Sequence, residues 1–226
     1  MTINGHSIAI NKEEVDQAGD AHIGTSLETP MRKDAFELDD DTKIEQIEEK
    51  FAEIMDILGL DLTDDSLSGT PHRVAKMYVK EIFAGLNPDA RPVMRTFDNK
   101  YEYNQMLVEK NIRLNSTCEH HFLPIYGKAH IAYISSGRVI GLSKLNRIVD
   151  FYAKRPQVQE RLTRQISEDL KKALNTEDVA VVIDAKHMCV SSRGIQDEGS
   201  STVTCEFSGK FKEEKLRQDF WRAVQS

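Results

Sequence analysis

Apolar residues in the first half of the chain recur with the spacing of two amphipathic helices. From Ile44 to Leu58, and again from Val74 to Phe83, they fall three or four residues apart and therefore line one helix face. Thr42 opens a capping box before the first helix. Thr70-Pro71 combines a cap with a proline at the first helical position of the second helix, which is expected to end at Gly85.

After about residue 96 the apolar positions take the spacing of β-strands. Strands are predicted at Met106–Thr117 and Thr202–Phe207, and strict alternation from Val179 to Cys189 predicts a half-buried strand. We interpret His121–Ser135 as a hairpin that turns at Tyr126-Gly127-Lys128.

Three further helices are expected among these strands. Ser143 would cap a helix that Arg155-Pro156 interrupts, a second helix runs from Val158 to Leu174, and residues 212–225 form a closing amphipathic helix. This order predicts an α+β fold, with helices on one face of an antiparallel sheet. We expect a largely flexible tail at residues 1–40, a helical region at 41–95 and a main domain at 96–226.

Negative charge is concentrated at the N-terminus. Residues 1–42 hold three basic and ten acidic side chains, which accounts for the whole net charge of −7 and leaves the remainder neutral. A neutral body argues against a general nucleic-acid-binding protein, whose surface would be net basic. The acidic tail, with a short helix expected near Lys12–Ala18, is either a solvated extension or a regulatory segment.

The sequence shows neither a secretory signal nor an apolar run long enough for a membrane span, so we expect a cytoplasmic protein without a membrane partner. Three cysteines in that setting do not indicate a disulfide framework. Two of them lie in candidate metal-binding segments, and Cys205, in the middle of a predicted strand, is assigned to the core.

Two short segments contain residue types that bind zinc. Cys118 and His121 form a Cys-x-x-His turn, and in a strand His187 and Cys189 would point to the same face. Ligation by Cys118, His121 and Cys189 would leave a fourth position for water, as in catalytic zinc sites. The alternative is two ordinary buried thiols beside hydrogen-bonded histidines. The spare histidines His120 and His187 favour zinc, because hydrolysis also needs a proton carrier.

A basic cluster lies where a predicted helix begins after Gly141. Ser143 is at the expected cap, and Lys144 and Arg147 are three residues apart, so they can face the same way. Helix-start amides with two cations suit a polyphosphate, to which Arg193 and Arg73 could add further charge. The alternative is a capped helix with solvated basic side chains.

Gln159-Glu160 begin the helix that follows Pro156. A carboxylate in the first turn is stabilised by the helix dipole, which is the ordinary interpretation. Glu160 could instead accept two N–H donors from the edge of a guanine base. The spacing leaves both interpretations open.

Four long motifs, in order and spacing, resemble the GTP cyclohydrolase I family from about residue 42 to the C-terminus. They are Thr70-Pro71-His72-Arg73-Val74-Ala75-Lys76-Met77, Ser116-Thr117-Cys118-Glu119-His120-His121-Phe122, Gly141-Leu142-Ser143-Lys144-Leu145-Asn146-Arg147 and Arg155-Pro156-Gln157-Val158-Gln159-Glu160-Arg161-Leu162. Four such motifs in one chain are highly specific. The tail takes no part in the resemblance.

The resemblance implies that residues 96–226 form a catalytic tunnelling-fold domain, an antiparallel sheet with two helices on one face. It implies a toroidal homodecamer of two stacked five-membered rings, with active sites at subunit interfaces. The implied reaction is the Zn²⁺-dependent conversion of GTP and water to formate and 7,8-dihydroneopterin triphosphate, the first step of pterin (folate or tetrahydrobiopterin) biosynthesis. A regulatory protein partner is left open.

The family's functional residues match positions of this chain one by one. Cys118, His121 and Cys189 match the zinc ligands, His120 matches the catalytic acid/base, and His187 matches a second histidine that assists proton transfer. The positions that match substrate contacts are Ser143, Lys144 and Arg147 for triphosphate and ribose, Arg193 and Arg73 for phosphate, and Glu160 with Gln159 for guanine.

Two other functions compete with this one. The first is a zinc-stabilised, catalytically silent nucleotide-binding regulator or scaffold of the same fold. The complete Cys118, His121 and Cys189 set with His120 argues against it. The second is a different pterin or deazapurine enzyme, such as a reductase or synthase, which should lack the Cys-Glu-His-His run.

Overall fold

The computed structural model describes residues 2–3, 6–7 and 26–226. The helix expected near Lys12–Ala18, and most of the acidic tail, lie outside the described residues. Near the N-terminus, β1 (Thr2–Ile3) pairs with β2 (His6–Ser7) in an antiparallel ladder. Among the described helices, none is both long enough and apolar enough to cross a membrane.

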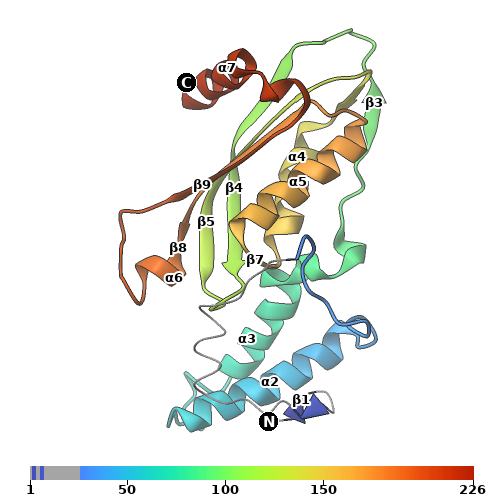
Figure 1. Cartoon of the computed structure of the whole chain (residues 1–226). Coiled ribbons are helices and arrows are strands. Elements are labelled where there is room, and N and C mark those ends of the chain that lie inside the picture. Colours follow the sequence, from blue (N-terminus) through green and yellow to red (C-terminus); the bar gives the residue numbers. More distant parts are fainter. Residues whose placement is uncertain (1, 4–5, 8–25) are drawn as a thin grey trace.

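A twisted five-stranded sheet forms the centre of the chain (Figure 1). Its strands, in spatial order, are β7 (Pro156–Gln157), β4 (Met106–Cys118), β5 (Pro124–Ile134), β8 (Val179–His187) and β9 (Thr202–Phe207). Neighbouring strands are antiparallel except for the short β7, which runs parallel to β4. A separate two-stranded ladder joins β3 (Thr96–Asp98) to β6 (Arg138–Ile140).

The hairpin prediction at Tyr126-Gly127-Lys128 is wrong, because these residues lie inside β5. The actual turn spans residues 119–123, between β4 and β5. Gly127 is required there by close packing rather than by a turn. A Cβ at this position would lie 2.1 Å from the carbonyl oxygen of Asp184 and 2.5 Å from Cα of Ala185 on the neighbouring strand.

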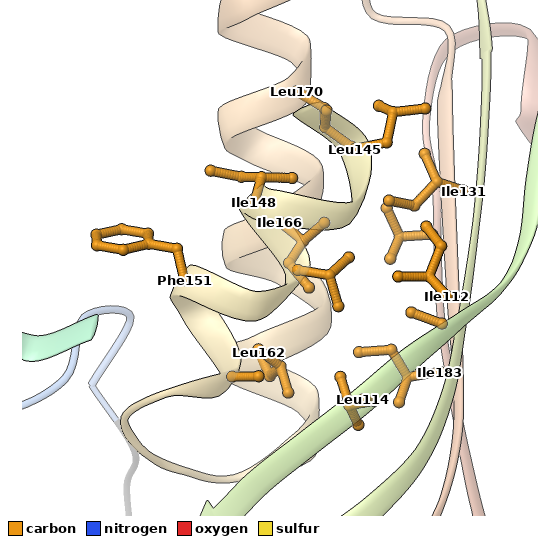
Figure 2. Packing of buried hydrophobic residues seen from close by; sticks show 14 of the residues in the cluster. Ile112, Leu114, Ile131, Leu145, Ile148, Phe151, Leu162, Ile166, Leu170 and Ile183 are labelled. Atoms are coloured by element: carbon orange, nitrogen blue, oxygen red, sulfur yellow. The ribbon is translucent and has the colours of Figure 1, made fainter. Parts of the chain in front are cut away.

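Two helices cover one face of the sheet, as predicted. These are α4 (Leu142–Ala153) and α5 (Gln159–Leu174). Their apolar sides meet one face of the strands in the main core, which Figure 2 shows from close by. The core includes Ile112, Leu114, Ile131, Leu145, Ile148, Leu162, Ile166, Leu170 and Ile183. Burial of each such side chain contributes about 1.5–3 kcal/mol, which fixes both helices on the sheet.

The closing helix α7 (Glu214–Gln225) lies on the opposite face of the sheet (Figure 1). Phe220 of α7 and the preceding Phe211 are fully buried there against alternate residues of β5 and β8. Because side chains alternate between the two faces of a strand, β5 and β8 contribute to both cores. Cys205, which was assigned to the core, is exposed on the edge strand β9, so that prediction is wrong.

The N-terminal helical region contains α2 (Asp40–Ile57) and α3 (Thr70–Met77), which pack against each other. Asp39, not Thr42, caps α2, because its carboxylate accepts the amide of Thr42 at 2.8 Å. Gly69 likewise precedes α3 in place of the expected cap at Thr70. The α-helix ends at Met77, before the expected Gly85, and continues as a π-helical turn at Tyr78–Ile82.

Candidate active site

Three potential metal ligands converge at one end of the sheet. One ligand atom from each of Cys118, His121 and Cys189 lies within 4.8 Å of the others. Ligands around a tetrahedral zinc ion stand about 3.5–3.8 Å apart, given its bond lengths, so a small contraction would bring all three onto one ion. The predicted convergence of these residues is therefore confirmed, and the group is able to hold a metal.

Different local structures supply the three side chains. Cys118 is the buried last residue of β4, and His121 lies in the exposed turn that follows. The strand expected to carry Cys189 ends earlier, at His187, and Cys189 belongs to a one-turn helix, α6 (Met188–Ser191). The argument that His187 and Cys189 share a strand face is therefore wrong. The chain leaves the sheet after His187 pairs with Ile125, and α6 then returns Cys189 toward Cys118.

The chemistry of the donor set fits a divalent cation. Burial raises the pKa of the Cys189 thiol, and the neighbouring Cys118 raises this pKa further. Two thiolates this close would repel each other in the absence of positive charge. A metal ion removes that repulsion and favours deprotonation of both thiols.

The turn between the first two ligands has a defined backbone. The amide of Cys118 donates to the carbonyl of Leu123 at 2.8 Å, and the amide of Phe122 donates back to the carbonyl of Cys118 at 2.9 Å. Phe122 adopts a left-handed conformation, with φ of 54°. Its ring packs on Phe83, with centroids 5.2 Å apart, so the turn also contacts the N-terminal helical region.

Two groups expected at the site lie beside the ligands. His120 is exposed, and its Nδ1 is 3.6 Å from Sγ of Cys118. Arg193, from the segment after α6, places Nη1 2.8 Å from Nε2 of His121. The structure thus brings a candidate acid/base and a candidate phosphate-binding cation to the metal group, as the sequence predicted.

His187 is held by a buried amide. The side-chain nitrogen of Gln159, a residue only 1% exposed, donates to the carbonyls of Ile183 and Thr202 and to the Thr204 hydroxyl. Its oxygen therefore faces Nε2 of His187, at 2.8 Å. This assigns the proton to Nε2 and leaves Nδ1 as the basic nitrogen. Burial lowers the pKa of His187, which the nearby Glu160 carboxylate opposes.

Glu160 and Gln159, the expected guanine-binding residues, have different surroundings. Glu160 is exposed in the first turn of α5, at the sheet end that also carries the metal group. Gln159 points inward, and its amide is engaged by the partners described above. Contact between either side chain and a guanine base stays a prediction.

The basic cluster of α4 lies at the other end of the sheet. Asn146 donates to Glu109 near the start of β4, whereas the carbonyl of Ala153 accepts from Ser116 near its end. Ser143, Lys144 and Arg147 lie toward the Asn146 end, about 9–15 Å along the helix axis from Ala153, whose carbonyl meets β4 two residues before Cys118.

The structure also shows the local surroundings of Ser143 and Arg73. Ser143 is not the cap of α4, because Gly141 precedes the helix and no side chain caps it. Arg73 is exposed on α3, and its guanidinium lies over Gly69, 2.9 Å from where a Cβ would be. One chain therefore brings Arg193, but not the α4 cluster, to the metal group.

The sequence did not single out Arg161, which holds the metal-binding turn. Its guanidinium pairs with Glu119, the residue between Cys118 and His120 in the turn. The signal available in the sequence was an acidic residue, Glu119, in one motif and a basic residue, Arg161, in another. Pairing across 42 residues could not be inferred before the fold brought the start of α5 beside the end of β4.

Comparison with known proteins identifies the family of the chain. The family model described as GTP cyclohydrolase I matches residues 47–225. GTP cyclohydrolase 1 of Flavobacterium johnsoniae is 63% identical over 210 residues, covering 93% of this chain and 94% of that protein. GTP cyclohydrolase 1 of Salmonella arizonae is 53% identical over 206 residues, covering 91% and 93%.

Among solved structures, the apo form of the archaeosine synthase QueF-Like covers 46% of this chain and 93% of that chain, with 22% identity and a TM-score of 0.39. The matches to the family model and to the curated relatives extend over most of the chain, and they confirm the resemblance that the four motifs carry. The chain belongs to the GTP cyclohydrolase I family.

Proposed function

We propose that this chain is a zinc-dependent GTP cyclohydrolase I, which converts GTP and water to formate and 7,8-dihydroneopterin triphosphate. Family membership and two relatives of that name, at 63% and 53% identity, support the activity. The structural observation that carries the proposal is the convergence of Cys118, His121 and Cys189, with His120 beside them. The reaction begins pterin biosynthesis.

Zinc is the metal that the donor set favours. Two thiolates and one imidazole suit zinc better than magnesium or calcium, which prefer oxygen ligands. Three protein ligands leave one coordination position open. A zinc ion held there would lower the pKa of water toward about 7 and so supply a nucleophile at neutral pH.

His120 is assigned to proton transfer at the guanine imidazole ring. Protonation of N7 makes C8 electrophilic, water adds to C8, and cleavage of the C8–N9 bond leaves a formamide. A second water releases formate from that formamide. The exposed position of His120 next to Cys118 supports this role, because a proton donor must reach the base from the metal side.

The later steps require proton transfer at the ribose, which we assign to His187 and Ser143. The ribose opens and rearranges to a ketose, and the freed amine then closes on the ketone with loss of one water. Gln159 supports the role of His187, because it holds the proton on Nε2 and leaves Nδ1 able to accept one. Burial lowers the pKa of His187 and so favours its neutral form.

Both ends of the substrate have candidate anchors. Glu160 would accept the N–H groups of the guanine edge, with Gln159 behind it. The triphosphate, which carries about four negative charges, would be held by Ser143, Lys144, Arg147, Arg193 and Arg73. Binding energy from the two ends would orient C8 over the metal group.

A site with all these groups needs more than one chain. In a single subunit the α4 cluster lies toward the end of α4 that is remote from Cys118. We therefore infer that a neighbouring subunit supplies Ser143, Lys144 and Arg147, in a toroidal homodecamer of tunnelling-fold domains at residues 96–226. Two stacked pentamers would place the sites at subunit interfaces. The three free cysteines fit a cytoplasmic enzyme.

The proposed function is tested by incubating the purified, zinc-loaded protein with GTP. We expect formate and, after oxidation, a fluorescent pterin in equal amounts. The metal content of the same sample is measured in parallel. Binding of GTP without formate release, in a sample with full zinc occupancy, would support the silent scaffold and contradict the enzyme.

A further inference from the structure

Glu119 is the one residue of the Cys-Glu-His-His run to which the proposed chemistry assigns no role. Its carboxylate meets the guanidinium of Arg161 through two contacts, Nη1–Oε2 at 2.5 Å and Nη2–Oε1 at 3.2 Å. The Arg161 side chain is 3% exposed and that of Glu119 is 22% exposed. A two-point pair of this kind fixes orientation as well as distance.

Arg161 is itself held firmly. It lies in the first turns of α5, next to the fully buried Leu162, and its remaining nitrogen, Nε, donates to the carbonyl of Ser26 at 2.9 Å. The amide of Glu119 adds a backbone bond to the carbonyl of Gln157, at 3.0 Å. The turn is therefore attached to the start of α5 through both its backbone and its side chain.

We propose that the Glu119–Arg161 pair is a positioning device, which holds the turn so that Cys118 and His121 face the same metal ion. This inference rests on the proposed metal site. The turn exposes His120, His121 and Phe122, and the contact of Phe122 with Phe83 does not fix the two histidines. Glu119 is adjacent to one ligand and two residues from the other, and a shift of its anchor therefore moves the Cys-x-x-His geometry directly.

The pair is also sensitive to loss of either partner. Loss of the Glu119 carboxylate leaves the Arg161 guanidinium buried and unpaired, which strongly destabilises the folded protein. Loss of Arg161 leaves Glu119 unpaired, and its side chain would turn toward water. Residues that orient metal ligands in this way typically change metal affinity or activity by about 10–100-fold when substituted. The pair does not touch the substrate in the proposed site, so its loss is expected to act on metal retention and on kcat more than on KM.

The test compares zinc release from the full-length, zinc-loaded protein to a chromophoric chelator. Glu119→Gln, which is nearly isosteric, and Arg161→Gln are each expected to release zinc about 10–100-fold faster, and the double variant no faster than the single ones. Arg161→Lys should fall in between, because a lysine keeps the charge but not the two-point contact. Arg164→Gln is the matched control, an exposed arginine on the same helix, and should behave like the unaltered protein.

A purely structural role would lower the unfolding temperature without changing zinc release well below that temperature. That result in Glu119→Gln would overturn the inference, as would independent effects that multiply in the double variant. Cobalt substitution gives a second readout, since a disturbed thiolate–imidazole site should change the visible d–d bands. If the unaltered protein fails to retain zinc, the metal site itself is wrong and the positioning role falls with it. If it retains zinc and the variants match it, only the positioning role fails.

Discussion

Cys118, His121 and Cys189 come from a strand end, a turn and a one-turn helix, so each depends on different local structure. Cys118 belongs to the main core between the sheet and α4 and α5, Cys189 packs against that core, and His121 is exposed. Of the two thiols, Cys189 is the one that can be shortened without removing a fully buried core residue.

We expect Cys189→Ala to lose zinc and activity together, while the protein stays folded. With only two remaining ligands, the affinity for zinc should fall by at least a factor of about 100. Metal analysis after gel filtration, with the formate assay on the same fractions, measures both quantities. Cys205→Ala is the matched control, because Cys205 is exposed on β9 and outside the ligand group, and it should keep both. Stoichiometric zinc in Cys189→Ala would contradict the ligand assignment.

His130 gives a prediction on pH. It is buried in β5, where its Nδ1 accepts the amide of Asn111, a residue with φ of 59° at the bulge of β4. Burial lowers the pKa of His130, Lys128 acts in the same direction, and Asp184 opposes both. In the unfolded chain a histidine has a pKa of about 6.5, so below that pH the unfolded state takes up a proton that the folded state resists.

The stability that His130 contributes is therefore present above about pH 6.5 and decreases as the pH falls below it. Urea unfolding at about pH 7.5 and about pH 5.5 should show a smaller loss of stability for His130→Gln than for the unaltered protein. Glutamine keeps an acceptor for the Asn111 amide but does not titrate. An equal loss in both proteins would show that His130 does not contribute to the pH dependence.

At the level of elements, periodicity predicted most of the strands and helices, because each of them has one buried face. β4, α5 and β9 lie within about two residues of the expected positions. Failures occurred where local signals were ambiguous. A glycine between two polar or aromatic residues is typical of a turn, but Gly127 lies in the middle of β5. A glycine is required there because the backbone of Asp184 comes so close, and this close approach arises only when β5 pairs with β8.

Residue types indicated a metal group, whose three members do converge, and a basic cluster, but not how the two groups lie relative to each other. Cys189 was expected on a strand and reaches its partners from α6 instead. The distance between Ser143 and Cys118 depends on the direction of α4 along β4, which local sequence does not encode. Likewise, the partner of Arg161 became identifiable only once the fold placed Glu119 beside it.

The contrast between two glycines is testable. Gly127→Ala should destabilise the protein by about 1–3 kcal/mol or more, because the added Cβ would meet backbone atoms of β8 at 2.1 and 2.5 Å. Gly141→Ala is the control, since Gly141 has φ of −66° and a Cβ added there would meet nothing within 4 Å, and it should change stability by less than about 0.5 kcal/mol. Urea denaturation followed by circular dichroism gives both values. Equal effects would show that the strand spacing at Gly127 is not the constraint.

At the scale of the whole molecule, the separation of the α4 cluster from the metal group predicts complementation between inactive variants. Lys144→Ala and Cys189→Ala should each be nearly inactive alone. After mixing, dissociation and reassembly, an interface can combine an intact metal group from one subunit with an intact Lys144 from its neighbour. With random assembly, about a quarter of the sites should be restored.

The formate assay on the reassembled mixture measures this recovery, and size-exclusion chromatography with light scattering gives the assembly mass. A mixture of Lys144→Ala with Lys144→Ala/Cys189→Ala is the control, because no pairing in it restores an intact Lys144. Absence of recovery in the first mixture, with decamers present, would place both groups within one subunit and contradict the interface site.

Contacts at Gly85 attach the N-terminal helical region to the C-terminal end of α4. The guanidinium of Arg155 lies 4.5 and 4.7 Å from the centroids of the Phe151 and Tyr152 rings and donates to the Gly85 carbonyl at 2.7 Å. The Gly85 amide donates in turn to the carbonyl of Lys154, and a Cβ on Gly85 would lie 2.0 Å from the Phe151 oxygen. The backbones of the two regions are therefore in direct contact at Gly85. Residues 41–95 consequently cannot move as a lid independent of the main domain. Calorimetry should record a single unfolding transition for residues 41–95 and 96–226 together.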